Sequence, residues 1–416
     1  MAKIRERIVH DWQYLVVLTK WLIMGASIGC IGGVVGALFH IGVERATTLR
    51  LSHTWILYLL PAAGLLITAM YHFCHLEGKG TNDIIDSVHF GESVPLALVP
   101  LIFVSTVITH LCGGSAGREG AALQIGGGIG HHVGRILHLG EKDMPLATLS
   151  GMAAVFAALF GTPLAATMFA LEVISVGVLY YAGLVPCLTA ALVGNLIGTR
   201  MGVTPVRFTT IMPTVDVQHI LLTVVLAVGC AVASIVFCQL LHSTEHLAKK
   251  HLKNTYLRAA VGGVVLIGLT LLFGTDYNGA GMDVITRAVA GERMSAAAWV
   301  LKILFTAVTI GCGFKGGEVV PSFFVGATFG AAAAGILGLP VGFGAAIGMV
   351  AVFCGAVNCP IASCILGVEI FGAEGMLFFA VACAISYLLS GYRGLYSSQT
   401  ILYSKMRAEY INVKTR

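Results

Sequence analysis

Charged, hydroxyl and phenol side chains stand beside glycines in four short segments of an otherwise apolar chain. These segments are EGKGTND (77–83), GGSAGREG (113–120), GCGFKGGEVVP (311–321) and GYRGLYSSQ (391–399). Each is followed by a run that can be helical, and a helix N-terminus offers unpaired N–H groups at the positive end of its dipole. Such groups suit an anion. The four segments therefore predict an anion site, provided that the fold aims them at a common point.

The second and third segments each contain a glutamate beside glycines, Glu119 in GREG and Glu318 after a pair of glycines. A carboxylate among intramembrane helices is costly and needs a reason. The functional reason is that something charged passes close to the carboxylate. The structural alternative is an ion pair, with Arg118 for Glu119 and with Lys315 for Glu318.

The elements that position these residues belong to a membrane protein. Of 416 residues, 57% are hydrophobic and only 11% are charged, whereas soluble domains carry about 25% charged residues. Mean hydropathy is +0.89. The net charge of +5 is typical of basic cytoplasmic loops and does not indicate a nucleic-acid partner.

Apolar stretches of membrane length recur along the chain. We place them at 14–46, 54–74, 95–112, 144–180, 183–200, 219–243, 256–273, 297–313, 341–357 and 375–391. Glycine or proline interrupts the chain at 113–132, 161–163, 316–321 and 358–360. Interruptions at membrane depth are tolerated only where the backbone is buried in protein or lines a cavity.

The chain contains an internal repeat. AVFAALFGTPLAATMFALEV (154–173) matches AVFCGAVNCPIASCILGVEI (351–370), so that Pro163 aligns with Pro360 and Glu172 with Glu369. Paired, interrupted segments in two halves are typical of transporters that hold their substrate at the repeat interface. The placement of the two aligned glutamates favours a structural role at a helix end.

No residue pattern indicates an enzyme, a cofactor or a metal site. We find no nucleophile elbow, phosphate loop or zinc-ligand spacing, and the eleven cysteines lie mostly inside apolar runs. His131 and His132 are adjacent, so they do not share a helix face.

The order of the four motifs resembles that of the CLC superfamily of anion channels and proton-coupled antiporters. Chloride-type members carry GSGIP, GREGP, GGIFAP and a late tyrosine. Here these places are GKGTN (78–82), GREGA (117–121), GGEVVP (316–321) and Tyr396. The resemblance covers about residues 14–404 and implies an all-α polytopic membrane protein, with two inverted-topology repeats built of many tilted and broken helices.

Two features are similar to the fluoride/proton antiporter subclass of this superfamily. Glu318 adds a carboxylate to the third motif, and GLYSSQ surrounds Tyr396. Chloride/proton antiporters have two adjacent glutamates after PLAG, and the second is the internal proton acceptor. Here Glu172 takes the first place and Val173 the second, so that acceptor is missing. Two departures from the subclass are Thr81, where Asn or Met is usual, and Val320, where Thr is usual.

The resemblance assigns roles to the site residues. Glu119 is expected to be the external gate, which occupies an anion position and swings out when protonated. Glu318 is expected to be a second proton carrier, and Tyr396 to donate a hydrogen bond to a dehydrated anion. The alternatives are an interfacial tyrosine for Tyr396 and helix N-capping for Thr81 or Asn82. The expected anion-binding residues are Gly80, Thr81, Asn82, Gly117, Val319, Val320 and Tyr396.

The expected function is proton-coupled fluoride export across a bacterial inner membrane. The alternative is a chloride channel or chloride/proton exchanger of the same fold, which Thr81 and Val320 favour. A membrane scaffold or a metal-ion transporter leaves both glutamates unexplained. The resemblance also implies a homodimer with one pore per subunit, in contact with membrane lipid. We expect an interfacial helix at 1–13, repeats at 14–200 and 201–404, and a short tail at 405–416.

Overall fold

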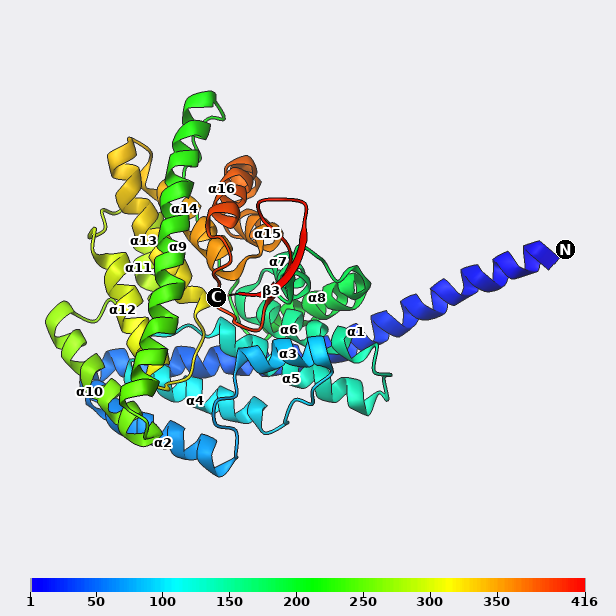
Figure 1. Cartoon of the computed structure of the whole chain (residues 1–416), viewed down its shortest axis with the longest axis horizontal. Coiled ribbons are helices and arrows are strands. Elements are labelled where there is room, and N and C mark those ends of the chain that lie inside the picture. The colour runs from blue at the N-terminus through cyan, green and yellow to red at the C-terminus, as the bar shows by residue number, and fades with distance from the viewer. Residues whose placement is uncertain (1, 416) are drawn as a thin grey trace.

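The structure is a computed structural model that describes the backbone of residues 2–415 and the side chains of residues 12–415. The described chain is almost entirely helical, with one short strand in its first half and two near its C-terminal end (Figure 1). Six helices are long and apolar enough to cross a membrane, and shorter apolar helices pack beside them. The expected all-α membrane architecture is confirmed. An interfacial helix was expected at 1–13. Its contact with the membrane would depend on the side chains of residues 1–11, which lie outside the described side chains.

Eight α-helices form the first half of the chain. They are α1 (Ala2–Ser52), α2 (Leu60–Phe73), α3 (Thr81–Phe90), α4 (Leu98–Cys112), α5 (Glu119–Ile136), α6 (Met144–Phe160), α7 (Pro163–Glu172) and α8 (Leu184–Arg200). Two 3-10 turns, η1 (Thr54–Leu59) and η2 (Tyr181–Gly183), and strand β1 (Ser175–Val176) connect them.

Eight further α-helices form the second half. They are α9 (Val217–His251), α10 (Thr255–Phe273), α11 (Met282–Val289), α12 (Ala298–Gly311), α13 (Val319–Leu337), α14 (Val341–Val357), α15 (Pro360–Phe371) and α16 (Met376–Leu389). The 3-10 turn η3 (Ala373–Gly375) precedes α16, and strands β2 (Thr400–Tyr403) and β3 (Tyr410–Lys414) follow it. Each half thus contains one very long helix at its start, and the two long helices cross in Figure 1.

Glycines set the closest helix packing, and they do so at matching places in both halves. A Cβ added to Gly126 on α5 would lie 2.2 Å from the Gly151 carbonyl oxygen on α6. A Cβ added to Gly326 on α13 would likewise lie 2.2 Å from the Gly348 carbonyl oxygen on α14. Only glycine permits backbones to approach this closely. The packing keeps α5 and α13 rigidly placed, and these helices begin at two of the glycine motifs.

The two halves also cap each other's short helices. The Glu172 carboxylate, at the end of α7, accepts hydrogen bonds from the N–H groups of Ile361 and Ala362 in the first turn of α15. The Glu369 carboxylate, on α15, accepts hydrogen bonds from Leu164 and Ala165 in the first turn of α7. Each carboxylate therefore satisfies N–H groups that the helix itself leaves unpaired. The structural role expected of these aligned glutamates is observed.

The C-terminal strands connect the ends of both halves. Strand β2 pairs in parallel with β1 and antiparallel with β3. Between α16 and β2, the Gln399 amide nitrogen donates to the carbonyls of Val173 and Val357, one from each half. The Thr415 hydroxyl donates to the Tyr396 carbonyl. The loop that carries Tyr396 is thereby fixed to both repeats.

Candidate anion-binding site

The second and third glycine motifs meet at a backbone bridge. Gly117 and Gly317 form an isolated antiparallel pair, in which each N–H donates to the other's carbonyl at 2.7 Å. A Cβ on Gly317 would lie 2.3 Å from the Gly120 nitrogen, so the motif must be glycine there. The bridge brings together the N-termini of α5 and α13, as the repeat predicted.

Both helix N-termini leave backbone donors unpaired within the helix. The first hydrogen bond of α13 runs from the Ser322 N–H to the Glu318 carbonyl. The N–H groups of Val319 and Val320 therefore have no partner in their own helix. In α5 the first bond runs from the Ala122 N–H to the Arg118 carbonyl. Donors of this kind, at the positive ends of two helix dipoles, can bind a dehydrated anion.

Glu119 already occupies such a position. Its side chain is buried, with 1% exposed, and its Oε2 accepts a hydrogen bond from the Arg118 backbone N–H at 3.0 Å. Oε1 lies 3.5 Å from the Arg118 Nε but has no hydrogen-bond partner among the described residues. The ion pair considered from the sequence is therefore present. The carboxylate nevertheless lies where an anion would bind at the start of α5.

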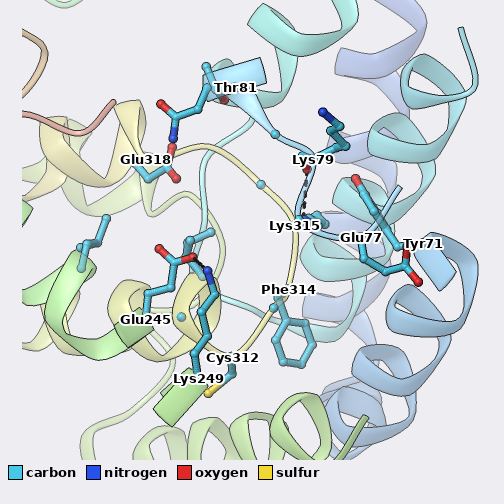
Figure 2. A pocket seen from close by; sticks show the side chains of 18 of the residues that line it. Tyr71, Glu77, Lys79, Thr81, Glu245, Lys249, Cys312, Phe314, Lys315 and Glu318 are labelled. Carbon is cyan, nitrogen blue, oxygen red and sulfur yellow. Dashed lines mark hydrogen bonds and ion pairs between the residues drawn. The ribbon is translucent and has the colours of Figure 1, made fainter. Parts of the chain in front are cut away.

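A cavity of about 460 Å³ collects residues from the first, third and fourth motifs, together with Gln124 of α5. Figure 2 shows Glu318 and Thr81 at the same end of this cavity. Gly80, Asn82 and Tyr396 line it as well. The remaining predicted residues, Gly117, Glu119, Val319 and Val320, are buried and do not line it. Glu119 is therefore buried outside the lining of this cavity.

Lys315 does not neutralise Glu318 in an ion pair. The Lys315 ammonium lies over the Tyr71 ring, 4.3 Å from its centroid, and donates to the Lys79 carbonyl at 3.5 Å (Figure 2). No Lys315–Glu318 ion pair is found within the described part of the chain. Glu318 therefore presents a carboxyl group to the cavity, where it can exchange a proton with water.

The first motif contributes side chains to the cavity and a capped helix start. Gly80, which precedes α3, donates its N–H to the Asp83 carboxylate at 2.8 Å. Thr81 Oγ1 accepts from the Gln124 amide at 3.0 Å, and Asn82 Oδ1 accepts from the Ser398 N–H at 3.1 Å. The N-cap of α3 is Gly80, so neither Thr81 nor Asn82 has the N-cap role that was the alternative.

At two of the predicted anion-binding residues, Gly80 and Gly117, the backbone N–H already has a partner. The N–H of Gly80 is used by Asp83, and the N–H of Gly117 is used by Gly317. These glycines build the turns that place their neighbours, and neither N–H is left for an anion. The backbone N–H groups that lack a helical partner lie one or a few residues further along the chain, because the first turn of a helix has no carbonyl groups before it to accept from them.

Tyr396 provides an unpartnered donor. Its side chain is 3% exposed, and its hydroxyl has no hydrogen-bond partner among the described residues. Buried hydroxyl groups are nearly always paired, so this phenol has a hydrogen available to donate. The nearby Tyr392 differs, because its hydroxyl lies 2.9 Å from Ser404 Oγ.

Two residues of the site were not singled out from the sequence. Gln124 on α5 and Ser398 after Tyr396 each hold a residue of the first motif. Ser398 Oγ also donates to Asp86. The only signal for Gln124 is that it is the one polar side chain between Glu119 and His131.

The chain is similar to anion transporters over nearly its whole length. The model of the voltage gated chloride channel family matches residues 63–391. A chloride/fluoride channel protein of Pseudomonas syringae pv. tomato is 37% identical, with 97% of this chain and 91% of that protein covered. An H⁺/Cl⁻ exchange transporter, ClcA of Vibrio campbellii, is 26% identical over 84% of this chain and 81% of its own length.

Solved structures agree with these similarities. A CLC-type fluoride/proton antiporter superposes with a TM-score of 0.89 at 31% identity, covering 92% of this chain and 98% of that one. A slow cyanobacterial Cl⁻/H⁺ antiporter has a TM-score of 0.75 at 18% identity, covering 89% and 94%. The similarity to the cyanobacterial Cl⁻/H⁺ antiporter shows only that the two chains share a fold.

Proposed function

This chain belongs to the voltage gated chloride channel, or CLC, family, and on that premise we propose that it exchanges fluoride for protons across a bacterial cell membrane. The protein acts as a multi-pass transporter and exports fluoride as protons flow inward. The similarity to a fluoride/proton antiporter structure and to a chloride/fluoride channel protein supports fluoride as the anion.

The observation that supports this proposal most directly is the position of a second carboxyl group, that of Glu318. Glu318 lines the same cavity as the unpartnered Tyr396 hydroxyl. Its Oε2 lies 3.2 Å from where a Cβ of Gly120 would be. Gly120 follows Glu119, so the two carboxyl-bearing residues lie on either side of the Gly117–Gly317 bridge.

The proposed cycle uses the two glutamates in turn. Ionised Glu119 occupies the anion position at the start of α5, and protonation frees that position for fluoride. Glu318 takes up or releases the proton at the cavity. Fluoride is small and strongly hydrated. Its binding site must therefore provide strong hydrogen bonds that replace those of the water lost from the ion. The N–H groups of Val319 and Val320 and the hydroxyls of Thr81 and Tyr396 can do so.

The decisive test is Glu119→Gln in proteoliposomes. The wild type should export fluoride faster than chloride, and an inward proton gradient should drive fluoride uphill. Glu119→Gln cannot change its charge, so proton-driven accumulation should be abolished. Unchanged coupling in this variant would rule out the gate assignment. Chloride flux that equals or exceeds fluoride flux in the wild type would instead favour a chloride transporter of the same fold.

We also propose that the protein is a homodimer with one pore in each subunit, an assembly inferred from its family. Residues 14–200 and 201–404 would form the two repeats of each pore. Residues 1–13 would lie at the membrane interface, and residues 405–416 would form the tail.

A further inference from the structure

Gln124 is a buried polar residue of the cavity to which the proposed transport cycle assigns no role. It lies on α5, one and a half turns beyond Glu119, and only 4% of it is exposed. It lines the same cavity as Thr81, Glu318 and Tyr396. An amide in this position has two ends, a donor at Nε2 and an acceptor at Oε1.

The donor end determines what Thr81 can do. Gln124 Nε2 donates to Thr81 Oγ1 at 3.0 Å. A hydroxyl whose oxygen accepts a hydrogen bond keeps its own hydrogen available to donate. No described hydrogen bond takes up that hydrogen. The amide thus fixes Thr81 as a donor toward the cavity, which is the role that an anion requires.

The acceptor end has no partner in the described structure. Gln124 Oε1 is buried and unpaired, and a buried acceptor without a donor is costly. An anion cannot satisfy it, because an anion is itself an acceptor. The partner must therefore carry a hydrogen, and a protonated carboxyl group is such a partner.

Glu318 lies on the correct side of α5 to be that partner. Its Oε2 is 3.2 Å from the position that a Cβ on Gly120 would take. Gly120 and Gln124 are four residues apart in one helix, so they share a face. The carboxyl group thus packs against the face of α5 that also carries the unpaired amide oxygen.

We propose that Gln124 is a positioning residue that links the two transported ions. Its Nε2 holds the Thr81 hydroxyl as a donor to fluoride, and its Oε1 accepts a hydrogen bond from protonated Glu318. If Glu318 were ionised, its carboxylate oxygen and the amide oxygen would both be acceptors and could not form a hydrogen bond. The amide oxygen therefore favours protonated Glu318. This inference rests on the proposed function, and it assigns to one side chain the contact between the fluoride site and the proton site.

The test compares four variants in proteoliposomes, with fluoride and proton fluxes recorded together. Gln124→Met keeps the length of the side chain but removes both ends of the amide. We expect fluoride flux to fall about tenfold, as the loss of one hydrogen bond to a charged group would give, and the fluoride-to-proton ratio to change. Thr81→Val should lower the fluoride-over-chloride flux ratio but keep the fluoride-to-proton ratio. Thr81→Ser should restore the wild-type values. Gln218→Met, at an exposed position on α9, is the matched control and should change nothing.

A fifth variant covers the case in which Gln124→Met does not fold. Gln124→Glu places a second carboxyl group beside Glu318, and two neighbouring carboxyl groups hold a shared proton more tightly. Its flux–pH profile should therefore move to higher pH. Wild-type coupling in folded Gln124→Met, or a wild-type pH profile in Gln124→Glu, would overturn the proposal. If the wild type itself carried no fluoride, the proposed function would fail instead, and the two failures are thus distinct.

Discussion

At the residue scale, the two tyrosines of the fourth motif differ in whether their hydroxyl has a partner. Tyr396 and Tyr392 are four residues apart, yet only Tyr392 has a polar partner for its hydroxyl. Of these two phenols, only that of Tyr396 is thus left without a partner in the described structure. A tyrosine at a membrane interface would instead direct its hydroxyl to water and headgroups.

The two tyrosines form a matched pair for mutation. Tyr396→Phe removes the donor without a change in ring volume, so fluoride should bind more weakly by about 1.5–3 kcal/mol, the range for a hydrogen bond to a charged group. That loss corresponds to a roughly 10–150-fold higher dissociation constant, since 1.4 kcal/mol is tenfold. Isothermal titration calorimetry measures it directly. Tyr392→Phe should leave fluoride affinity unchanged, and equal effects of both variants would contradict a direct contact with the anion.

The residues of the site were largely predictable from the sequence, but their partners were not. Glu119, Glu318 and Tyr396 are chemically unusual in an apolar chain, and each is found at a helix start or unpaired within the site. Gln124 has no local pattern of its own. Its importance comes from Thr81, which is distant in the sequence and becomes a neighbour only after folding.

At the element scale, the apolar stretches predicted most of the long helices but left out α5 and α13, the helices that follow the second and third motifs. The helix α5 contains six glycines in eighteen residues, and each costs about 1 kcal/mol relative to alanine in an exposed helix. Here the small side chains allow α6 to pack at backbone distance, and that packing outweighs the low propensity. The helices α3 and α11 lie outside the predicted apolar stretches for a different reason, because they are too short to cross a membrane, although a helical run after the first motif was predicted.

The reciprocal caps of α7 and α15 predict a defect in stability rather than in transport. Glu369→Ala removes the acceptor for two backbone N–H groups of α7. The free energy of unfolding should fall by about 1.5–3 kcal/mol per charged hydrogen bond lost. Thermal unfolding in detergent should show a lower midpoint, with a smaller loss in Glu369→Gln because one acceptor oxygen remains.

The controls separate this cap from a role in proton transfer. Glu374→Ala, at an exposed position beside α16, should leave the unfolding midpoint unchanged. Glu369→Ala should retain the wild-type fluoride-to-proton ratio in the protein that remains folded. A variant with normal stability and lost coupling would instead place Glu369 on the proton path.

At the scale of the whole molecule, the site belongs to a single chain. All four motifs, the Gly117–Gly317 bridge and the cavity are complete within one subunit. Transport should therefore not require a residue of a second subunit. In the proposed dimer, each pore would then work alone.

This independence can be measured in mixed dimers. A wild-type subunit and a Glu119→Gln subunit, purified together through two different affinity tags, should accumulate fluoride at about half the wild-type rate per dimer. Cross-linking in the membrane checks that the two tags share one particle. Full loss of proton-driven transport in the mixed dimer would mean that the subunits do not act independently.

The reciprocal carboxylate caps also have a consequence for biosynthesis. Leu164 donates its N–H to Glu369, which follows it by 205 residues. At a translation rate of about 5–20 residues per second, the acceptor emerges roughly 10–40 s later. During this interval the first turn of α7 lacks the Glu369 carboxylate that caps it, and strand β1 has not yet paired with β2. The first half must therefore be held by the insertion machinery or by lipid until translation ends, and a premature stop codon would leave a half-protein for proteolysis.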